Sequence, residues 1–143
     1  MFIGEFKHNL DEKGRMAIPA KMRALLKDGA MITRGLDNCL FLYTKEGWET
    51  EAADLKKLSK FNPKAREVLH NFFSGSAEVE FDGQGRTNIP ENLRRFAKLK
   101  KKAVVVGMYD RLEIWDEEMW NEYRQKAEQN NDQNAEALAG IGM

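Results

Sequence analysis

The sequence predicts an α+β fold with a mainly β core, built from two copies of one strand–turn–strand–helix–strand–strand unit. A signature occurs twice, as DEKGRMAIPAKMR at residues 11–23 and as DGQGRTNIPENLR at residues 82–94. Stretches of alternating apolar and polar residues flank both copies, which is typical of half-buried strands. Helical spacing of apolar residues follows each unit. Because self-similarity of this kind marks repeated supersecondary units, we expect the two halves to share one architecture.

The first unit is predicted to span residues 1–47. Its turn suits the residues present, because Asp11 can accept hydrogen bonds from downstream amides and Gly14 can adopt a positive φ. Pro19 favours an extended residue before it and a helix after it, and Gly29 closes that helix. The expected elements are a strand over 2–10, a turn over 11–14, a strand over 15–18, a short helix from 19, and strands over 31–33 and 40–43.

The second unit is predicted over residues 76–115 by the same reasoning. Its Asp82–Gly83 step is a strong hairpin signal between alternating residues, and Gly85 is equivalent to Gly14. The expected elements are strands over 77–81 and 86–89, a helix from 90 to 97, and strands over 103–106 and 112–115. Downstream of the signature the repeat continues with one inserted residue, pairing Gly35 with Gly107, Leu40 with Leu112, Tyr43 with Trp115 and Trp48 with Trp120.

Helices are expected to follow both units. A helical connection is predicted over 48–75 and a C-terminal helix over 116–128, with Asp116 as its N-cap. Residues 129–143 are rich in Asn, Gln, Asp, Ala and Gly. A segment with so little to bury is expected to be a mobile tail.

Composition places the chain among ordinary globular proteins, with 42% hydrophobic and 32% charged residues and a formal net charge of zero. It contains no run long enough to span a membrane and no signal-peptide pattern, and a lone cysteine fits a reducing compartment, so we expect a cytoplasmic protein. A net charge of zero gives no indication of a polyanionic partner. A local basic patch could still attract one, since the first 27 residues carry six Lys/Arg against three Asp/Glu.

The spacing of Asp and Arg in each turn allows two readings. In the first, Asp11 and Asp82 stabilise their turns and pair with Arg15 and Arg86 across them. In the second, the turns project these arginines towards a polyanion, because a guanidinium offers a planar fork of donors for phosphate or a guanine edge. The readings are compatible, with the aspartate orienting and the arginine contacting.

The pattern Asp-x-x-Gly-Arg-[apolar]-x-Ile-Pro-x-x-[apolar]-Arg resembles the swapped-hairpin signature of AbrB-type transcription factors. Two such units in one chain, each followed by helix, resemble the MraZ family. The resemblance runs to about residue 127 and includes TRGLDNCL at 33–40 and FSGSA at 73–77.

This resemblance implies that both halves form one pseudo-symmetric double-psi-type barrel and that subunits form a ring, with eight subunits expected. It implies a repressor that binds short direct repeats of double-stranded DNA in its own promoter, within the division and cell-wall gene cluster, and that is associated with the nucleoid. A protein partner that relieves repression is left open. By motif position, Arg15 and Arg86 would face DNA, with Lys13 beside the first; the more basic first copy is expected to dominate binding.

Other basic residues are weaker candidates. Lys7, Lys21 and Arg23 could contact phosphates. The run Lys98, Lys100, Lys101 and Lys102 is more typical of solvated charges at a helix end. Phe2, Phe72 and Phe73 are expected to belong to the core or to supply exposed apolar side chains at a subunit contact.

Two other classes of function remain. The first is an AbrB-like protein-interaction module, an antitoxin or scaffold, that does not bind specific DNA sequences. The second is an enzyme, for which the sequence offers little: His8, His70 and Cys39 lack metal-ligand or triad spacing, and no phosphate-cradling glycine motif occurs. We therefore expect no catalytic residue, no metal and no cofactor.

Overall fold

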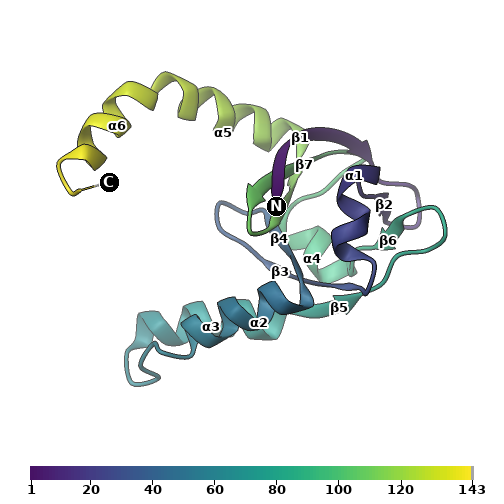
Figure 1. Ribbon diagram of the computed structural model, residues 1–143, viewed down its shortest axis with the longest axis horizontal. Helices are drawn as coiled ribbons and strands as arrows, with labels where there is room; N and C mark the ends of the chain where they lie inside the picture. The colour runs from purple at the N-terminus through teal and green to yellow at the C-terminus, as the bar shows by residue number, and fades with distance from the viewer. Residues whose placement is uncertain (143) are drawn as a thin grey trace.

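The computed structural model describes residues 1–142 as an α+β fold whose strands form a compact body with two helical arms (Figure 1). The strands are β1 (Phe2–Asn9), β2 (Arg15–Ala17), β3 (Ala30–Arg34), β4 (Leu40–Thr44), β5 (Ala77–Val79), β6 (Arg86–Asn88), β7 (Lys102–Tyr109) and β8 (Leu112–Asp116). The helices are α1 (Ala20–Arg23), the 3-10 helix η1 (Ala24–Leu26), α2 (Lys45–Leu55), α3 (Pro63–Gly75), α4 (Glu91–Phe96), α5 (Glu117–Gln129) and α6 (Asn131–Ala139).

The strands of the two copies interleave instead of forming separate sheets. Six strands make one antiparallel sheet in the order β1-β7-β8-β4-β3-β5, and β2 pairs with β6 in a separate two-stranded ribbon. The first strand of each copy therefore pairs with the other copy, β1 with β7 and β5 with β3. Neither half could complete its hydrogen bonding alone, which makes the two copies one folding unit.

A pseudo-twofold axis relates the copies, and the strand registers locate it. In the β2–β6 ribbon, Met16 lies opposite Thr87, its own equivalent in the other copy. In the sheet, Phe41 of β4 lies opposite Glu113 of β8, and these two are also equivalent. The axis therefore passes through the centre of the ribbon and the centre of the sheet.

One predicted equivalence is wrong. Sequence comparison pairs Gly35 with Gly107. In the β3–β4 hairpin, however, Arg34 is the residue opposite Leu40, and in the β7–β8 hairpin Gly107 is the residue opposite Leu112, the equivalent of Leu40. The spatial equivalent of Gly107 is therefore Arg34. Compared with the first copy, the second has a longer connection between its short helix and β7. Its β7–β8 hairpin loop is one residue shorter than the β3–β4 loop. The two changes partly cancel when the sequences are compared residue by residue.

The core lies between the ribbon, the sheet and the short helices. Both copies contribute residues that are wholly inaccessible to solvent, including Met16, Ile18, Ile32, Leu42, Ile89, Leu93, Leu112 and Ile114. Burying a side chain of this size stabilises a fold by about 1.5–3 kcal/mol. The shared core holds the ribbon firmly against the sheet.

The first arm is the hairpin of α2 and α3. Asn62 caps α3 by accepting hydrogen bonds from the amides of Lys64 and Ala65, and Pro63 occupies the first turn, where its missing N–H costs little. Trp48 of α2 stacks on Phe72 of α3 with ring centroids 5.8 Å apart. Phe72 is therefore only 6% exposed, and Phe2 of β1 is only 3% exposed. Neither side chain is the exposed apolar group that was considered for a subunit contact.

The second arm consists of α5 and α6. Asp116 caps α5 by accepting a hydrogen bond from the Met119 amide. The segment expected to be a mobile tail contains α6, which has high helix propensity through its alanines, glutamate and leucine. All its residues are exposed, and residue 143 lies outside the described residues. Among residues 1–142, no helix is both long enough and apolar enough to cross a membrane.

Candidate nucleic-acid interface

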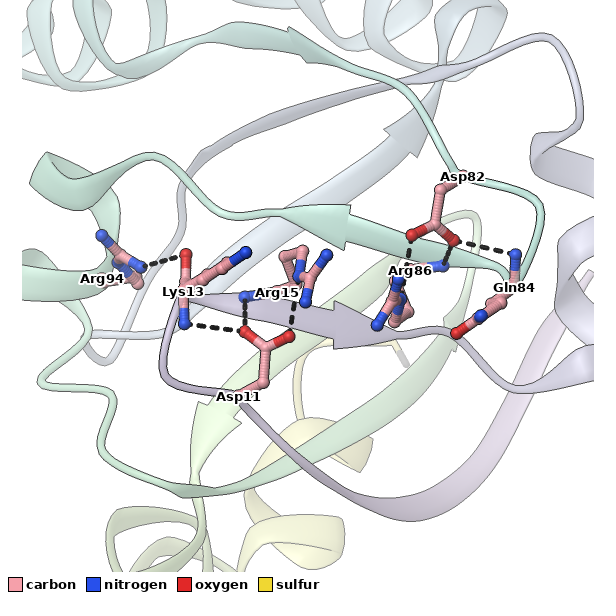
Figure 2. A network of polar contacts seen from close by, with 7 residues as sticks. All are labelled: Asp11, Lys13, Arg15, Asp82, Gln84, Arg86 and Arg94. Carbon is pink, nitrogen blue, oxygen red and sulfur yellow. Dashed lines mark hydrogen bonds and ion pairs between the residues drawn. The ribbon is translucent and has the colours of Figure 1, made fainter.

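The β2–β6 ribbon and its two turns lie at the end of the molecule away from the two helical arms (Figure 1). Each turn is closed by an aspartate that accepts three hydrogen bonds. Asp11 accepts from the amides of Lys13 and Arg15, both at 2.9 Å, and from Arg15 Nε at 2.7 Å (Figure 2). A positive φ of 77° at Gly14 turns the chain into β2.

The second turn repeats this geometry. Asp82 accepts from the amides of Gln84 and Arg86, both at 2.9 Å, and from Arg86 Nε at 2.9 Å. Gly85 has a φ of 74°. This geometry agrees with the first reading of the sequence: each aspartate stabilises its turn and pairs with its arginine. The second reading, contact with a polyanion, stays a prediction.

Hydrogen bonding keeps both aspartates ionised. The Arg15 backbone amide is the largest influence that lowers the pKa of Asp11, and the Arg86 amide has the same effect on the pKa of Asp82. A hydrogen bond to a carboxylate favours its charged form. At neutral pH each arginine consequently faces a negative charge that holds its Nε atom in place.

The ribbon register places both arginines on one face. Arg15 lies opposite Asn88 and Ala17 opposite Arg86, so these four side chains share the outer face. Met16 and Thr87 point the other way and are 0% and 2% exposed. Sequence alternation had indicated the short strands, but only the pairing between copies brings the two arginines together (Figure 2).

Both arginines keep unused donors. Their side chains are 32% and 31% exposed for Arg15 and Arg86. Each Nε is occupied by its aspartate, whereas neither Nη1 nor Nη2 donates a hydrogen bond to any of residues 1–142. The outward end of each guanidinium can therefore bind an external acceptor without breaking the turn.

A second pair of arginines braces the turns from across the pseudo-twofold axis. Arg23 was a candidate for phosphate contact; its Nε donates to the Ile18 carbonyl at 2.9 Å, and its side chain covers Gly85. Its equivalent, Arg94, covers Gly14 and donates from Nη1 to the Lys13 carbonyl at 3.3 Å. The last arginine of each signature thus supports the turn of the other copy.

The two lysine candidates lie in different places. Lys13 belongs to the first turn and its side chain is exposed beside Arg15. Lys7 projects from β1 towards Glu117 at the start of α5, with 3.8 Å between Nζ and Oε1. The structure therefore groups Lys13 with the ribbon and gives Lys7 a separate partner.

Sequence reasoning missed the position of Asn88 on the arginine face and the bracing role of Arg94. The repeated final arginine of the signature was a usable signal for the second, because Arg23 and Arg94 occur at the same offset from their turns. Their cross-copy target could not be seen without the interleaved topology. Within residues 1–142, no group of three or more His, Cys, Asp or Glu side chains could hold a metal ion.

Comparison with protein families accounts for the repeat. The model of the family described as "MraZ protein, putative antitoxin-like" matches residues 1–71 and then matches again over residues 72–140. The two matches cover both signatures and both helical arms. The chain therefore belongs to the MraZ family and consists of two tandem MraZ domains.

Proposed function

We propose that this protein is a sequence-specific DNA-binding transcriptional regulator whose β2–β6 ribbon enters the major groove. The observation that carries the proposal is the outer face of the ribbon, where Arg15 and Arg86 are fixed by aspartates and keep free terminal donors. No catalytic step, cofactor or metal is part of the proposal.

The dimensions and chemistry of the ribbon suit DNA. The major groove admits a two-stranded β-ribbon, and a bidentate arginine–guanine contact contributes about 1–3 kcal/mol of discrimination. Asn88 adds an amide of the kind that reads adenine. Because the arginines are already oriented by their aspartates, little side-chain entropy is lost on binding.

The family resemblance supplies the biological setting of the proposal. The protein would act as a repressor at direct repeats in its own promoter, within the division and cell-wall gene cluster, and would associate with the nucleoid. The interleaved strands would correspond to a swapped-hairpin, double-psi-type barrel. Subunits would assemble into a ring, with eight subunits as the expected number.

A ring would compensate for weak binding by each subunit. The chain carries 23 basic and 23 acidic residues, so one ribbon has little long-range attraction for DNA. When one subunit binds a repeat, its neighbours meet the next repeat at high effective concentration. Affinity would therefore rise steeply with the number of repeats.

The test is binding of the purified protein to DNA from upstream of its own gene, compared with scrambled DNA of equal length. Arg15→Ala and Arg86→Ala should each weaken specific binding at least about fivefold, the lower limit for one bidentate contact. Circular dichroism and oligomer size should not change. Affinity for the upstream DNA should also fall with added salt and with fewer repeats.

Arg124→Ala is the matched control. Arg124 of α5 also pairs with a carboxylate four residues away, Glu128, and its side chain is 35% exposed. It lies on a helical arm, far from the ribbon in Figure 1. If the control lost as much affinity as Arg15→Ala, or if the folded wild-type protein did not prefer its upstream DNA, the proposal would be wrong.

The family's antitoxin-like description favours one second candidate, a protein-interaction module. In that case the same ribbon would bind a protein surface that carries carboxylates. Failure of specific DNA binding by a folded oligomer, together with capture of an acidic protein partner that Arg15→Ala abolishes, would favour this alternative.

A further inference from the structure

An open hollow of about 950 Å³ lies beside the first turn. One wall is formed by residues 10–14, including Asp11 and Gly14, and the other by α4 and the connection that follows it. The two walls meet where Arg94 donates to the Lys13 carbonyl. The hollow therefore borders the ribbon at the end where Arg15 is held.

Five of the eleven residues that line the hollow are basic: Arg94, Arg95, Lys98, Lys100 and Lys101. Arg95 pairs with Glu91 at 3.4 Å, and Lys100 pairs with Glu118 at 3.7 Å. Lys98 and Lys101 form no ion pair with any of residues 1–142. These two ammonium groups can therefore bind an external anion.

The acidic residues at the hollow do not cancel this charge. Asp11 is engaged by Arg15, and Glu91 by Arg95. Glu12 alone adds a carboxylate with no ion pair within the described residues. With five basic and three acidic residues in its lining, the hollow is a net cationic surface that borders the ribbon.

The other end of the ribbon keeps Arg23 and Lys27, the equivalents of Arg94 and Lys98, but has no counterpart of Lys100 and Lys101. Between η1 and β3, the first copy has a connection of three residues, Lys27, Asp28 and Gly29, whose charges cancel. In the second copy the stretch before Ala103, the equivalent of Ala30, is two residues longer: Lys98-Leu99-Lys100-Lys101-Lys102, with four lysines, the last of which begins β7. This insertion also shifts the equivalence of β3 and β7. The lysines of this insertion make one side of an otherwise pseudo-symmetric ribbon more basic than the other.

We infer that the hollow binds a backbone phosphate of DNA that extends past one end of the ribbon, and that this contact sets the direction in which each subunit lies on the duplex. The inference rests on the proposed function. A ribbon with pseudo-twofold symmetry would contact a site in two opposite orientations with similar energy. Phosphate contacts position a protein on DNA without reading sequence. A phosphate site that is more basic at one end therefore favours one orientation, and a row of subunits so oriented matches direct repeats.

The test uses the double variant Lys98→Gln/Lys101→Gln of the full chain. It should retain specific binding to upstream DNA, while the slope of log affinity against log salt decreases by about 1 for each engaged subunit, because one phosphate contact is lost. Ethylation interference on wild-type complexes should mark phosphates at the ribbon and at one flank only. In the variant, interference at that flank should disappear and the ribbon phosphates should persist.

The matched control is Lys56→Gln/Lys64→Gln, which removes two exposed lysines, one directly after α2 and one in the first turn of α3. It should leave the salt slope and the interference pattern unchanged. Wild-type interference that is equal at both flanks, or a flank signal that survives in Lys98→Gln/Lys101→Gln, would overturn the inference while the proposed function stands. If the wild-type protein showed no specific binding to upstream DNA, the proposed function itself would be refuted.

A free anion could use the same ammonium groups, and calorimetry with inorganic phosphate in place of DNA separates the two sources. The inference expects no measurable heat at millimolar phosphate, because an isolated ion lacks the positioning supplied by the ribbon. Saturable binding that Lys98→Gln/Lys101→Gln abolishes, with DNA binding unaffected, would assign the hollow to a free phosphate ligand and overturn the DNA contact.

Discussion

The guanidinium of Arg94 lies over Gly14, in the space that a side chain at position 14 would occupy. Arg23 covers Gly85 in the same way across the pseudo-twofold axis. Each turn is thus completed by the helix of the opposite copy. The turn that carries one proposed DNA-contacting arginine depends on the other half of the chain.

Gly14→Ala should destabilise the protein by about 1–3 kcal/mol, measured by urea unfolding. An alanine would be strained at a φ of 77° and would displace Arg94 from the turn. DNA binding should weaken as well, because the turn orients Arg15. Gly83→Ala is the control: a Cβ there meets nothing within 4 Å, and Gly83 does not have a positive φ, so stability should change little. Equal losses at the two positions would show that cross-copy packing on Gly14 is unimportant.

Asp11→Asn/Asp82→Asn should reduce stability at pH 6 more than at pH 3. Both wild-type carboxyl groups have a pKa lowered by turn amides and arginine, so the unfolded chain binds more protons in acid. Their contribution is complete above the ordinary aspartate range near pH 4 and is lost as pH falls through the lower folded values. Urea unfolding at several pH values measures this. A difference between wild type and variant that stayed constant from pH 6 to pH 3 would contradict the ionic role.

Thr87→Val should leave the protein equally stable or more stable by about 1 kcal/mol. The Thr87 hydroxyl is buried beneath the ribbon and has no hydrogen-bond partner among the described residues. Valine has nearly the same shape and removes the unsatisfied group. DNA affinity should not change, because Thr87 points away from the arginine face. A clear loss of stability on calorimetry would mean that the hydroxyl is bonded in solution.

Cys39 should react with a disulfide reagent only when the protein unfolds. The residue is 1% exposed, and burial raises the pKa of its thiol, so the reactive thiolate is scarce in the native state. The rate of labelling should follow the rate of unfolding and should rise sharply in urea. Rapid labelling in native buffer would contradict the packing of Cys39 against Val104 and Trp115.

Local chemistry explains why much of the fold could be predicted. The turns at 11–14 and 82–85 were foreseeable, because aspartate and glycine have turn preferences that hardly depend on the rest of the chain. The helices after Pro63 and Asp116 were foreseeable from capping residues for the same reason. Helix α6 was not expected, since its polar composition indicated a tail although its residues have adequate helix propensity.

Long-range register explains most of what could not be predicted. The linear comparison placed Gly107 opposite the wrong partner in the repeat because an insertion and a deletion on either side of β7 partly cancel. Arg23 was a candidate for phosphate contact, yet its side chain lies on Gly85, far away in sequence. Lys7 lies on β1, an edge strand of the sheet, and faces Glu117 of α5, which is also far away in sequence.

By itself the sequence determined that this chain has two copies of one unit, with an aspartate-fixed arginine at each turn, because turn formation and ion pairing within five residues are local events. Tertiary structure decided that Arg15 and Arg86 share one face, that Arg94 supports Gly14, and that the lysines after α4 border only one end of the ribbon. These relationships depend on strand exchange between the copies. Hydrogen bonds and packing between segments about seventy residues apart select them.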